Sequence, residues 1–401
     1  MLRVAIVWLA LAVACSPPPA QIVPSRTPSA TVVALTASPT ATPTSATTPT
    51  PSAPREDLAA RFHPLVQAGW RPGGPIVVLE TSNGIDASLV AVSVATPPSS
   101  PMPLATFAGY ATWQLRADGT ALAVSLQVSA DTSRIATWDL ITGALRWVTP
   151  DEPGVQVGGP VWSMDGASIY YGSSRPTPTS YTDLGILRIA VDGTGRTVIH
   201  GADANGGLPR SLTPDGRGLA WSRTRAGGSV DVVDLATGAD RAFDPSAAGS
   251  AASWRAARPR VLVISGNCCA GYPGGALHLW DDIASTETVL LGPTVGPRLA
   301  VGAADWEPTG DRIAVVVYDR VNAPNISSIA ILDPRSGARQ AVAGTEGAVQ
   351  VRWLPSGIVY NTSTFGGPND LILIAPDGTS RTTLYHSTSR YPFGIAQVIL
   401  P

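Results

Sequence analysis

Short apolar runs separated by turns dominate the chain from residue 70 onward. Runs such as ALAVSL at 121–126 and RIAVVVY at 312–318 are rich in Val, Ile, Leu and Tyr, and turn residues bound them. β-Branched and aromatic residues favour strands, whereas Gly, Pro and Asp mark turns. A second apolar run follows each first one, as in RIATWDL at 134–140. The pattern predicts an all-β chain of consecutive antiparallel strands.

One unit of this pattern repeats along the chain. Each copy begins with a Trp or Leu just before a turn, and successive starts lie 42 to 52 residues apart. The starts are Trp70, Leu115, Trp162, Leu212, Trp254, Trp306 and Trp353. Each unit has a segment leading into that residue, two central strands, and a strand after an Asp-and-Gly turn. Four antiparallel strands at this period predict a seven-bladed β-propeller of four-stranded blades.

The positions of the central strands follow from the repeat. The first of each pair is expected at 76–80, 121–126, 168–173, 218–223, 261–265, 312–318 and 357–362. The second is expected at 88–94, 134–140, 185–191, 229–235, 276–282, 328–333 and 370–375. Residues 391–400 remain after the last unit, and we expect them to complete the first blade and close the ring. Residues 56–67 are expected to form a short helix interrupted near Pro64.

Two turns carry a resemblance to a known family. Leu212-Thr213-Pro214-Asp215-Gly216 and Trp162-Ser163-Met164-Asp165-Gly166 are similar to the Trp-Ser-Pro-Asp-Gly turn of the WD-like propeller repeat in the TolB family. The resemblance covers residues 70–390 and implies a propeller that serves as a protein-interaction platform. Related propellers are joined to peptidases. No α/β-hydrolase segment follows in this sequence, so the resemblance does not imply peptidase activity here.

The first 15 residues have the layout of a secretory signal. Arg3 precedes a hydrophobic run from Val4 to Val13, and small residues lead to Cys15. The run is too short for a stable membrane span. The ending LAVAC resembles the lipobox of bacterial lipoproteins, in which the Cys is acylated and becomes the new N-terminus, although Ala12 stands where that family usually has Leu. The alternative is an ordinary signal peptide that is cleaved near Ala14.

A linker follows the signal. Residues 16–54 consist largely of Ser, Thr, Pro and Ala, with Arg26 as the only charged residue. Such a segment buries too little apolar surface to offset its ordering entropy, so we expect a disordered tether. The expected division is therefore a lipoprotein signal peptide at 1–15, a disordered linker at 16–54 and a propeller at 55–401. The expected location is the extracytoplasmic side of a bacterial membrane, with a lipid anchor on Cys15.

Composition excludes several classes of function. The formal net charge is −2 and all 27 basic residues are Arg. The near-neutral balance predicts no nucleic-acid partner. A P-loop and a Schiff-base enzyme both need a Lys, so the sequence excludes both. The glycines at 193 and 195 lie in a predicted turn between strands, with no helix to receive a dinucleotide. We therefore expect no cofactor.

Catalytic and metal-binding motifs are also missing. The serine-hydrolase motif G-x-S-x-G does not occur, and the four histidines (His63, His200, His278 and His386) lie far apart in the repeat. Asp residues recur in the turns, at Asp139, Asp192, Asp234, Asp333 and Asp377. These residues could suggest Ca²⁺, but a dedicated Ca²⁺ loop has a denser pattern, and Asp is a preferred turn residue. We expect no catalytic residue and no metal site.

Adjacent cysteines form the one local irregularity. Cys268 and Cys269 lie in the Gly-rich segment SGNCCAGYPGG. In an oxidising compartment they could form a vicinal disulfide. This bond could act as a redox latch or as part of a ligand-binding lip, or it could simply stiffen the loop. The Trp residues at the unit starts have a fixed phase, which predicts packing between neighbouring blades rather than a binding platform.

The leading functional prediction is a membrane-tethered binding or scaffold protein. Its partner would be a protein, a peptide or a glycan bound on one face of the propeller. The alternatives are a propeller hydrolase or lyase with its active site at the central channel, and a purely structural envelope component. Because the Trp and turn residues recur in every unit, any specificity is expected in the loops between the two central strands, such as 319–325 and 266–275.

Overall fold

The sheets in the described part of this protein consist of antiparallel strands, most of them consecutive in the chain. The computed structural model describes residues 58–82, 86–95, 100–109, 111–177, 180–202, 207–223, 230–242, 249–254, 260–265, 275–281, 286–292, 299–319, 323–362, 369–388 and 393–400. The predicted signal peptide and linker lie outside these residues. Within the described ranges, no helix has the length and apolarity needed to cross a bilayer.

Six sheets, named B to G, are four-stranded meanders in which strands pair in chain order. Sheet B contains β5 (Thr112–Leu115), β6 (Ala121–Gln127), β7 (Ser133–Asp139) and β8 (Leu145–Trp147). Sheet C contains β9 (Gln156–Trp162), β10 (Ser168–Thr177), β11 (Ser180–Ala190) and β12 (Thr197–His200). Sheet D contains β13 (Gly207–Leu212), β14 (Gly218–Arg223), β15 (Val230–Asp234) and β16 (Asp240–Ala242).

The remaining meanders follow the same order. Sheet E contains β17 (Gly249–Trp254), β18 (Arg260–Ser265), β19 (Leu277–Asp281) and β20 (Thr286–Leu291). Sheet F contains β21 (Leu299–Trp306), β22 (Ile313–Asp319), β23 (Ala323–Leu332) and β24 (Arg339–Ala341). Sheet G contains β25 (Ala348–Leu354), β26 (Gly357–Thr362), β27 (Asn369–Ile374) and β28 (Arg381–Ser387). Every predicted central strand overlaps an observed one.

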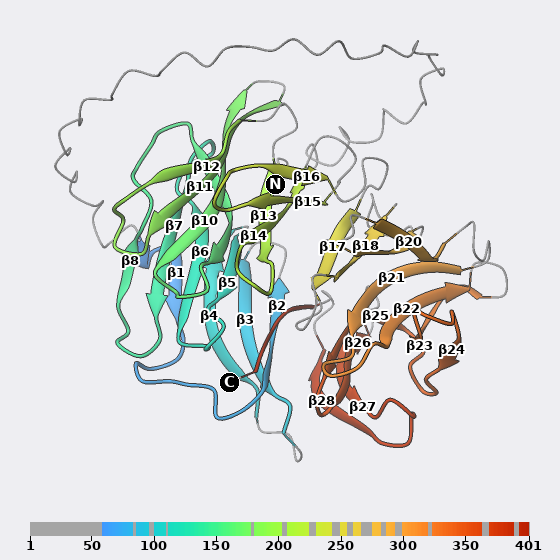
Figure 1. Ribbon diagram of the computed structural model, residues 1–401. Helices are drawn as coiled ribbons and strands as arrows, with labels where there is room; N and C mark the ends of the chain where they lie inside the picture. Colours follow the sequence, from blue (N-terminus) through green and yellow to red (C-terminus); the bar gives the residue numbers. More distant parts are fainter. Residues whose placement is uncertain are drawn as a thin grey trace, which may run out of the picture. The chain divides into compact units, whose positions relative to one another are not determined.

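Sheet A joins the two ends of the described chain. It contains β1 (Phe62–Pro64), β2 (Ile76–Ser82), β3 (Asp86–Ser93), β4 (Met102–Ala108) and β29 (Gly394–Ile399), in the order β1-β4-β3-β2-β29. Figure 1 shows the red β29 beside the blue β2. The expectation that residues 391–400 complete the first sheet is therefore confirmed for Gly394–Ile399.

The helix predicted over 56–67 is wrong for its second half. Residues 58 and 59 have helical backbone, but Phe62–Pro64 form β1, which pairs with β4 at the edge of sheet A. The cause is tertiary packing: the buried Phe62 ring lies 5.5 Å from the rings of both Phe107 and Trp138. Pro64 is tolerated because an edge strand has an unpaired side.

Apolar side chains pack each sheet against the next. Separate buried clusters join sheets A and B, B and C, C and D, E and F, F and G, and G and A. Between sheets D and E, β17 lies next to β14 and β15. The core is thus a series of interfaces between sheets rather than one central cluster, as the predicted architecture requires.

Three of the repeated Trp residues belong to these interfaces, as predicted. Trp162, Trp306 and Trp353 are all less than 7% exposed, and each packs with residues of the preceding sheet. Trp70 is half-buried against the cluster of sheets A and B. Trp254 lies in β17, whose side chains are outside the described part of the structure.

First strands of successive sheets are also linked by hydrogen bonds, with β29 in the position of the first strand in sheet A. The Leu115 amide donates to Gln397 Oε1 at 2.8 Å, and the Trp162 amide donates to Gln114 Oε1 at 2.7 Å. The Trp353 amide donates in the same way to Asp305 Oδ2 at 2.9 Å. In each pair the acceptor belongs to the first strand of the preceding sheet. We call these bonds first-strand links.

Each sheet has two chemically different ends. At the turn end of sheets B, C, D and F, the first strand leads into the second and the third into the fourth through short Asp- and Gly-containing turns. At the loop end, the second strand leads into the third, and the chain enters the first strand. β10, β11 and β23 extend further toward the loop end than the sequence predicts. The loop end therefore carries the parts that differ between units.

Candidate functional site

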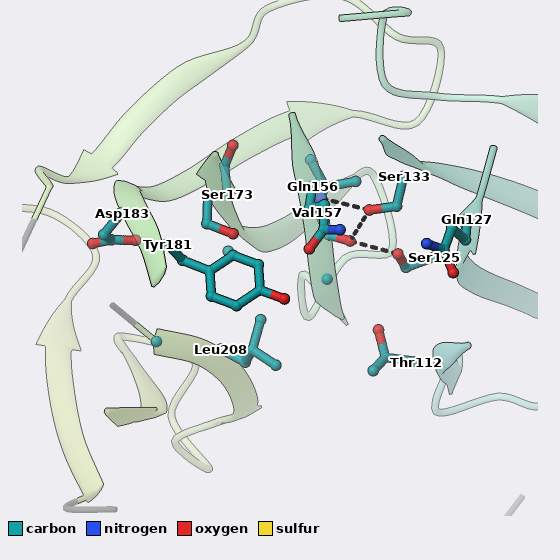
Figure 2. A pocket seen from close by; sticks show the side chains of 14 residues that line it. Thr112, Ser125, Gln127, Ser133, Gln156, Val157, Ser173, Tyr181, Asp183 and Leu208 are labelled. Atoms are coloured by element: carbon teal, nitrogen blue, oxygen red, sulfur yellow. Dashed lines mark hydrogen bonds between the residues drawn. The ribbon is translucent and has the colours of Figure 1, made fainter. Parts of the chain in front are cut away.

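A pocket of about 610 Å³ opens at the loop end of sheets B, C and D. This volume lies in the range of about 300–1,000 Å³ that is typical of small-molecule sites. Most of the residues named around it are neutral and polar in type, and Figure 2 labels ten of them. The lining residues are Thr112, Ser125, Gln127, Ser133, Gln156, Val157, Gly158, Gly172, Ser173, Ser174, Tyr181, Asp183, Gly207 and Leu208.

The meander explains why these residues meet. In an antiparallel sheet, the start of the first strand, the end of the second and the start of the third all lie at the same end. Thr112, Gln156 and Leu208 stand at or near the starts of the first strands β5, β9 and β13. The residues 172–174 lie toward the end of β10, and Tyr181 near the start of β11. Residues distant in sequence thus surround one space.

Hydroxyl groups of sheet B hold the β9 side of the pocket in place. Ser125 Oγ donates to the Val157 carbonyl at 2.5 Å, and Ser133 Oγ donates to the same oxygen at 2.8 Å. The Val157 amide donates back to Ser133 Oγ at 2.7 Å, and the Gly159 amide donates to Thr112 Oγ1 at 2.9 Å. Polar groups on this edge of β9 are therefore already satisfied within the protein.

Glycines allow sheets C and D to approach closely beside the pocket. A Cβ on Gly172 would lie 2.5 Å from the Gly207 carbonyl oxygen. A Cβ on Gly159 of β9 would lie 2.8 Å from the Pro209 carbonyl oxygen of β13. Real Cβ atoms do not tolerate such distances, so larger residues would push the sheets apart and change the pocket wall.

A long hairpin carries the aromatic residue of the pocket. β10 and β11 pair beyond the length of the neighbouring strands, with a bulge where Ser173 pairs with Gly185 and Ser174 with Asp183. Bulges bend a strand and re-aim its side chains. Tyr181 is 53% exposed, and its ring lies between Ser173 and Leu208 with its hydroxyl directed into the pocket (Figure 2).

Ser173 provides a buried polar group that faces the pocket. The residue is 3% exposed, and its hydroxyl has no hydrogen-bond partner in the part of the chain that the structure describes. Leaving a buried hydroxyl without a partner costs about 1–3 kcal/mol. Buried hydroxyls of this kind need an explanation, and a ligand hydrogen bond would supply one.

The charge of the pocket lining is low. Among the described lining residues, Asp183 is the one acid, and none is Arg, Lys or His. Asp183 also takes part in an interaction within the chain. A second acid, Glu80, lies outside the lining, and Trp113 Nε1 donates to its Oε2 at 3.0 Å. Burial raises the pKa of Glu80, and the hydrogen bond from Trp113 offsets part of that rise.

None of the sequence-predicted site residues is among the described lining residues of this pocket. Cys15, Cys268 and Cys269 lie outside the described residues. The four histidines belong to four different sheets: His63 in A, His200 in C, His278 in E and His386 in G. In the described part of the chain, no three His, Cys, Asp or Glu residues form a group that could hold a metal ion.

The turn Asp residues serve as backbone acceptors, in agreement with the structural interpretation of their spacing. Asp234 Oδ1 accepts from the amides of Ala236 and Thr237, and Asp333 Oδ1 accepts from the amide of Arg335. Asp139, Asp192 and Asp377 accept comparable bonds. Hydrogen bonds from the backbone and from neighbouring hydroxyls lower the pKa of Asp234.

Sequence reasoning indicates the loops between central strands, but it does not identify these lining residues. The two loops that it singles out, 319–325 and 266–275, belong to sheets F and E. Residues 320–322 and 266–274 lie outside the described residues, and 323–325 form the start of β23. The pocket lies beside the corresponding loops of sheets B and C. The sequence signal that could have indicated the pocket is the segment SYTDL, which lies between the two predicted central strands of its unit. This segment carries an aromatic residue, Tyr181, and an acidic residue, Asp183, in place of a turn motif.

Comparisons with known proteins give a fold but no family. No protein-family model matches the chain, and no curated protein matches it in sequence. A puromycin hydrolase structure has a TM-score of 0.54 at 16% identity, covering 80% of this chain and 55% of its own. A prolyl endopeptidase structure has a TM-score of 0.56 at 16% identity, covering 87% and 53%.

Two further neighbours are more similar in size to this chain. An oligogalacturonate lyase in complex with manganese has a TM-score of 0.50 at 12% identity and covers 79% of this chain and 85% of its own. TolB from Acinetobacter baumannii has a TM-score of 0.43 at 15% identity, covering 80% and 68%.

At these identities the similarity concerns the fold alone. The chain is all-β, with mostly four-stranded antiparallel sheets and propeller proteins among its structural neighbours. It spans about half the length of the hydrolase and the peptidase.

Proposed function

We propose that this protein is a membrane-tethered, extracytoplasmic binding protein of the TolB-like type that holds a small polar ligand in the loop-end pocket. The observation that carries the proposal is the pocket itself: about 610 Å³ of space, with Ser, Thr and Gln side chains among its lining residues. Within it, Ser173 presents a buried hydroxyl without a partner among the described residues. A few polar groups in a concave, pre-formed site are the usual features of ligand recognition.

The folded domain is, in this proposal, a closed seven-bladed propeller. Support comes from the packing of consecutive sheets, which includes the cluster that joins sheet G to sheet A. The pairing of β29 with β2 adds strand hydrogen bonds across the same junction. In a closed ring the first strands line the axis, so the pocket would open at the axis on one face.

The tether is proposed from the sequence. The signal-like first 15 residues, Cys15 and the Ser/Thr/Pro-rich linker would place the propeller outside the cytoplasm on a lipid anchor. The test is radiolabelled palmitate incorporation and membrane fractionation of the wild type and of Cys15→Ser. The proposal expects label and membrane association only in the wild type. A cleaved, unlabelled wild-type protein would instead support the ordinary signal peptide.

A binding role suits the pocket better than hydrolysis. Acid–base catalysis of glycoside or peptide cleavage uses at least two positioned titratable groups, or a nucleophile with a base. The lining residues within the described ranges offer one carboxylate and no His. The hydrolase or lyase alternative is motivated by the hydrolase, peptidase and lyase neighbours, and it is the second candidate.

The binding proposal is tested by filling the pocket. Ser174 lines it, and Ser174→Trp should occupy the space and abolish ligand-induced thermal stabilisation in a screen of sugars, peptides and amines. Thr177→Trp is the matched control, because Thr177 is exposed on the same strand and does not line the pocket. Ligand binding that both variants retain would place the site elsewhere and overturn the proposal.

A further inference from the structure

We propose that the ligand of the pocket is an uncharged oligosaccharide that stacks one sugar ring on Tyr181 and hydrogen-bonds to Ser173. The inference deepens the proposed function and rests on it. It follows from four properties of the pocket: its charge, its hydrogen-bonding chemistry, its exposed aromatic ring and the satisfied backbone along β9.

Charge excludes the acidic and strongly basic ligands. An anionic ligand such as a uronate, a phosphate or a peptide carboxylate needs Arg, Lys or a cluster of amides. None of the lining residues that the structure describes is basic, and Asp183 would repel an anion. A cationic ligand would find one carboxylate among the described lining residues, that of Asp183, which already takes part in another interaction. A neutral ligand is therefore the class that this lining fits.

The polar side chains match hydroxyl groups. Ser and Thr hydroxyls donate one hydrogen bond and accept up to two, and Gln amides both donate and accept. Sugar hydroxyls have the same dual character. Ser173, which is 3% exposed and whose Oγ is unpartnered in the described chain, lines the pocket next to the Tyr181 ring (Figure 2). A sugar hydroxyl bonded there would recover the free energy that this buried group otherwise costs.

Tyr181 supplies an apolar face with a polar tip. The residue is one of few large apolar or aromatic side chains in the described chain that are more than half exposed, and it is the one of these that lines the pocket. Exposed aromatic rings with a hydroxyl suit ligands that have an apolar face and an edge of hydrogen-bonding groups. A pyranose ring has this character, with C–H groups on its faces and hydroxyls around its edge.

An extended peptide fits less well. Peptides that join a sheet edge need free main-chain groups on the edge strand. On β9, the Val157 amide and carbonyl are already bonded to Ser133 and Ser125, and the Gly159 amide to Thr112. A peptide would have to displace these hydrogen bonds. An oligosaccharide needs only the side chains that point into the space.

The experiment uses the full-length protein and a defined set of probes. Neutral gluco-, manno- and chito-oligosaccharides, the acidic oligogalacturonates, a mixed-peptide library and choline are each titrated by calorimetry. We expect saturable binding of a neutral oligosaccharide and binding of acidic ones at least about tenfold weaker. Tyr181→Ala should weaken the neutral ligand about tenfold. Val198→Ala, at an exposed position on β12 of the same sheet, should not change it.

Ser173→Ala separates binding from folding. Because Ser173 has no partner among the described residues, the variant should keep or raise the melting temperature and yet lose about fivefold in affinity. A fall in affinity accompanied by an equal fall in stability would contradict the assigned hydrogen bond.

Failure of this inference is distinguishable from failure of the proposed function. If only peptides, choline or acidic sugars bind, and Ser174→Trp abolishes that binding, the pocket is a binding site but the neutral-glycan assignment is wrong. If no probe binds, or binding survives Ser174→Trp, both the ligand class and the pocket are wrong.

Discussion

Single side chains at the turn ends hold this fold together through charge and hydrogen bonds. In the turn between β5 and β6, Arg116 donates to both carboxylate oxygens of Asp118, at 3.0 and 2.9 Å, and the Thr120 amide donates to Oδ1 at 3.0 Å. Burial alone would raise the pKa of Asp118. The bonds from Arg116 and Thr120 and the charge of Arg116 outweigh it and lower the pKa to about 2.

The lowered pKa of Asp118 predicts how stability depends on pH. An unfolded Asp titrates near about 3.9, so the native state favours the charged form. The stabilisation of the native state by the charged Asp118 carboxylate is fully present above the unfolded-state pKa, and it is lost as the pH falls from about 4 toward 2. Urea midpoints measured between pH 5 and pH 2.5 should therefore fall less in Asp118→Asn than in the wild type.

The exposed Asp151→Asn variant is the control for that measurement, since it removes the same charge without the turn hydrogen bonds. If both variants change the pH dependence equally, the effect comes from net charge and not from the Asp118 turn. Because Asp118 is largely solvent-accessible, we expect a modest difference in midpoint.

At the scale of the element, the β10–β11 hairpin depends on one glycine. Gly185 adopts φ +102°, and a Cβ there would lie 2.3 Å from the His200 carbonyl oxygen. Gly185→Ala should lower the free energy of unfolding by about 2–4 kcal/mol, from backbone strain and from displacement of β12. It should also weaken ligand binding, because the bulge positions Tyr181.

Gly195→Ala is a matched control in the same sheet. Gly195 has φ +63°, but a Cβ at this position would meet no atom within 4 Å beyond its two chain neighbours. This variant should cost only the conformational free energy of the backbone, about 1–2 kcal/mol, and leave ligand affinity unchanged. Chemical denaturation and calorimetry of both variants measure the two effects. Equal losses of stability would show that the contact with His200 is unimportant.

The sequence predicts the elements that local pattern determines. It does not predict those that depend on packing against residues distant in the chain. The central strands follow from alternating turns and apolar runs, so the pattern predicts every one of them. It does not predict β1, because Phe62 forms a strand only by packing on Phe107 and Trp138. The bulge at Gly185 is not predictable either, since a register shift depends on the partner strand and leaves no local signal.

At the scale of the whole molecule, one junction connects residues far apart in sequence. β29 pairs with β2, and Gln397 forms the first-strand link to Leu115. Deleting residues 393–401 would expose the edge of β2 and remove that link. We expect a lower melting temperature and concentration-dependent aggregation, because exposed strand edges pair with other chains.

A peptide of residues 393–401 added in trans should restore the melting temperature of the truncated protein, and a scrambled peptide should not. Differential scanning fluorimetry with increasing peptide measures this recovery. A truncated protein that is as stable as the full chain would show that β29 contributes little to the structure.

The pocket is not predictable from the sequence for a related reason. The repeat places all loop ends together, so the sequence indicates the correct end of the sheets. The particular side chains come from three units and face one space only because sheets B, C and D pack in succession. Ser173 illustrates this, since its residue type is ordinary and only its burial without a partner among the described residues makes it informative.

The β2–β29 pairing also sets an order for the protein's synthesis. β2 leaves the ribosome before any of the six meanders, yet its partner strand is made only after all of them. Until then β2 has an unpaired edge, and closing so long a loop is slow compared with forming local hairpins. The meanders can each fold as they emerge, but sheet A cannot be completed before Ile399 has been added. A stop codon just before Gly394 would therefore leave a chain with all its other strands but without this one, open to proteases along β2.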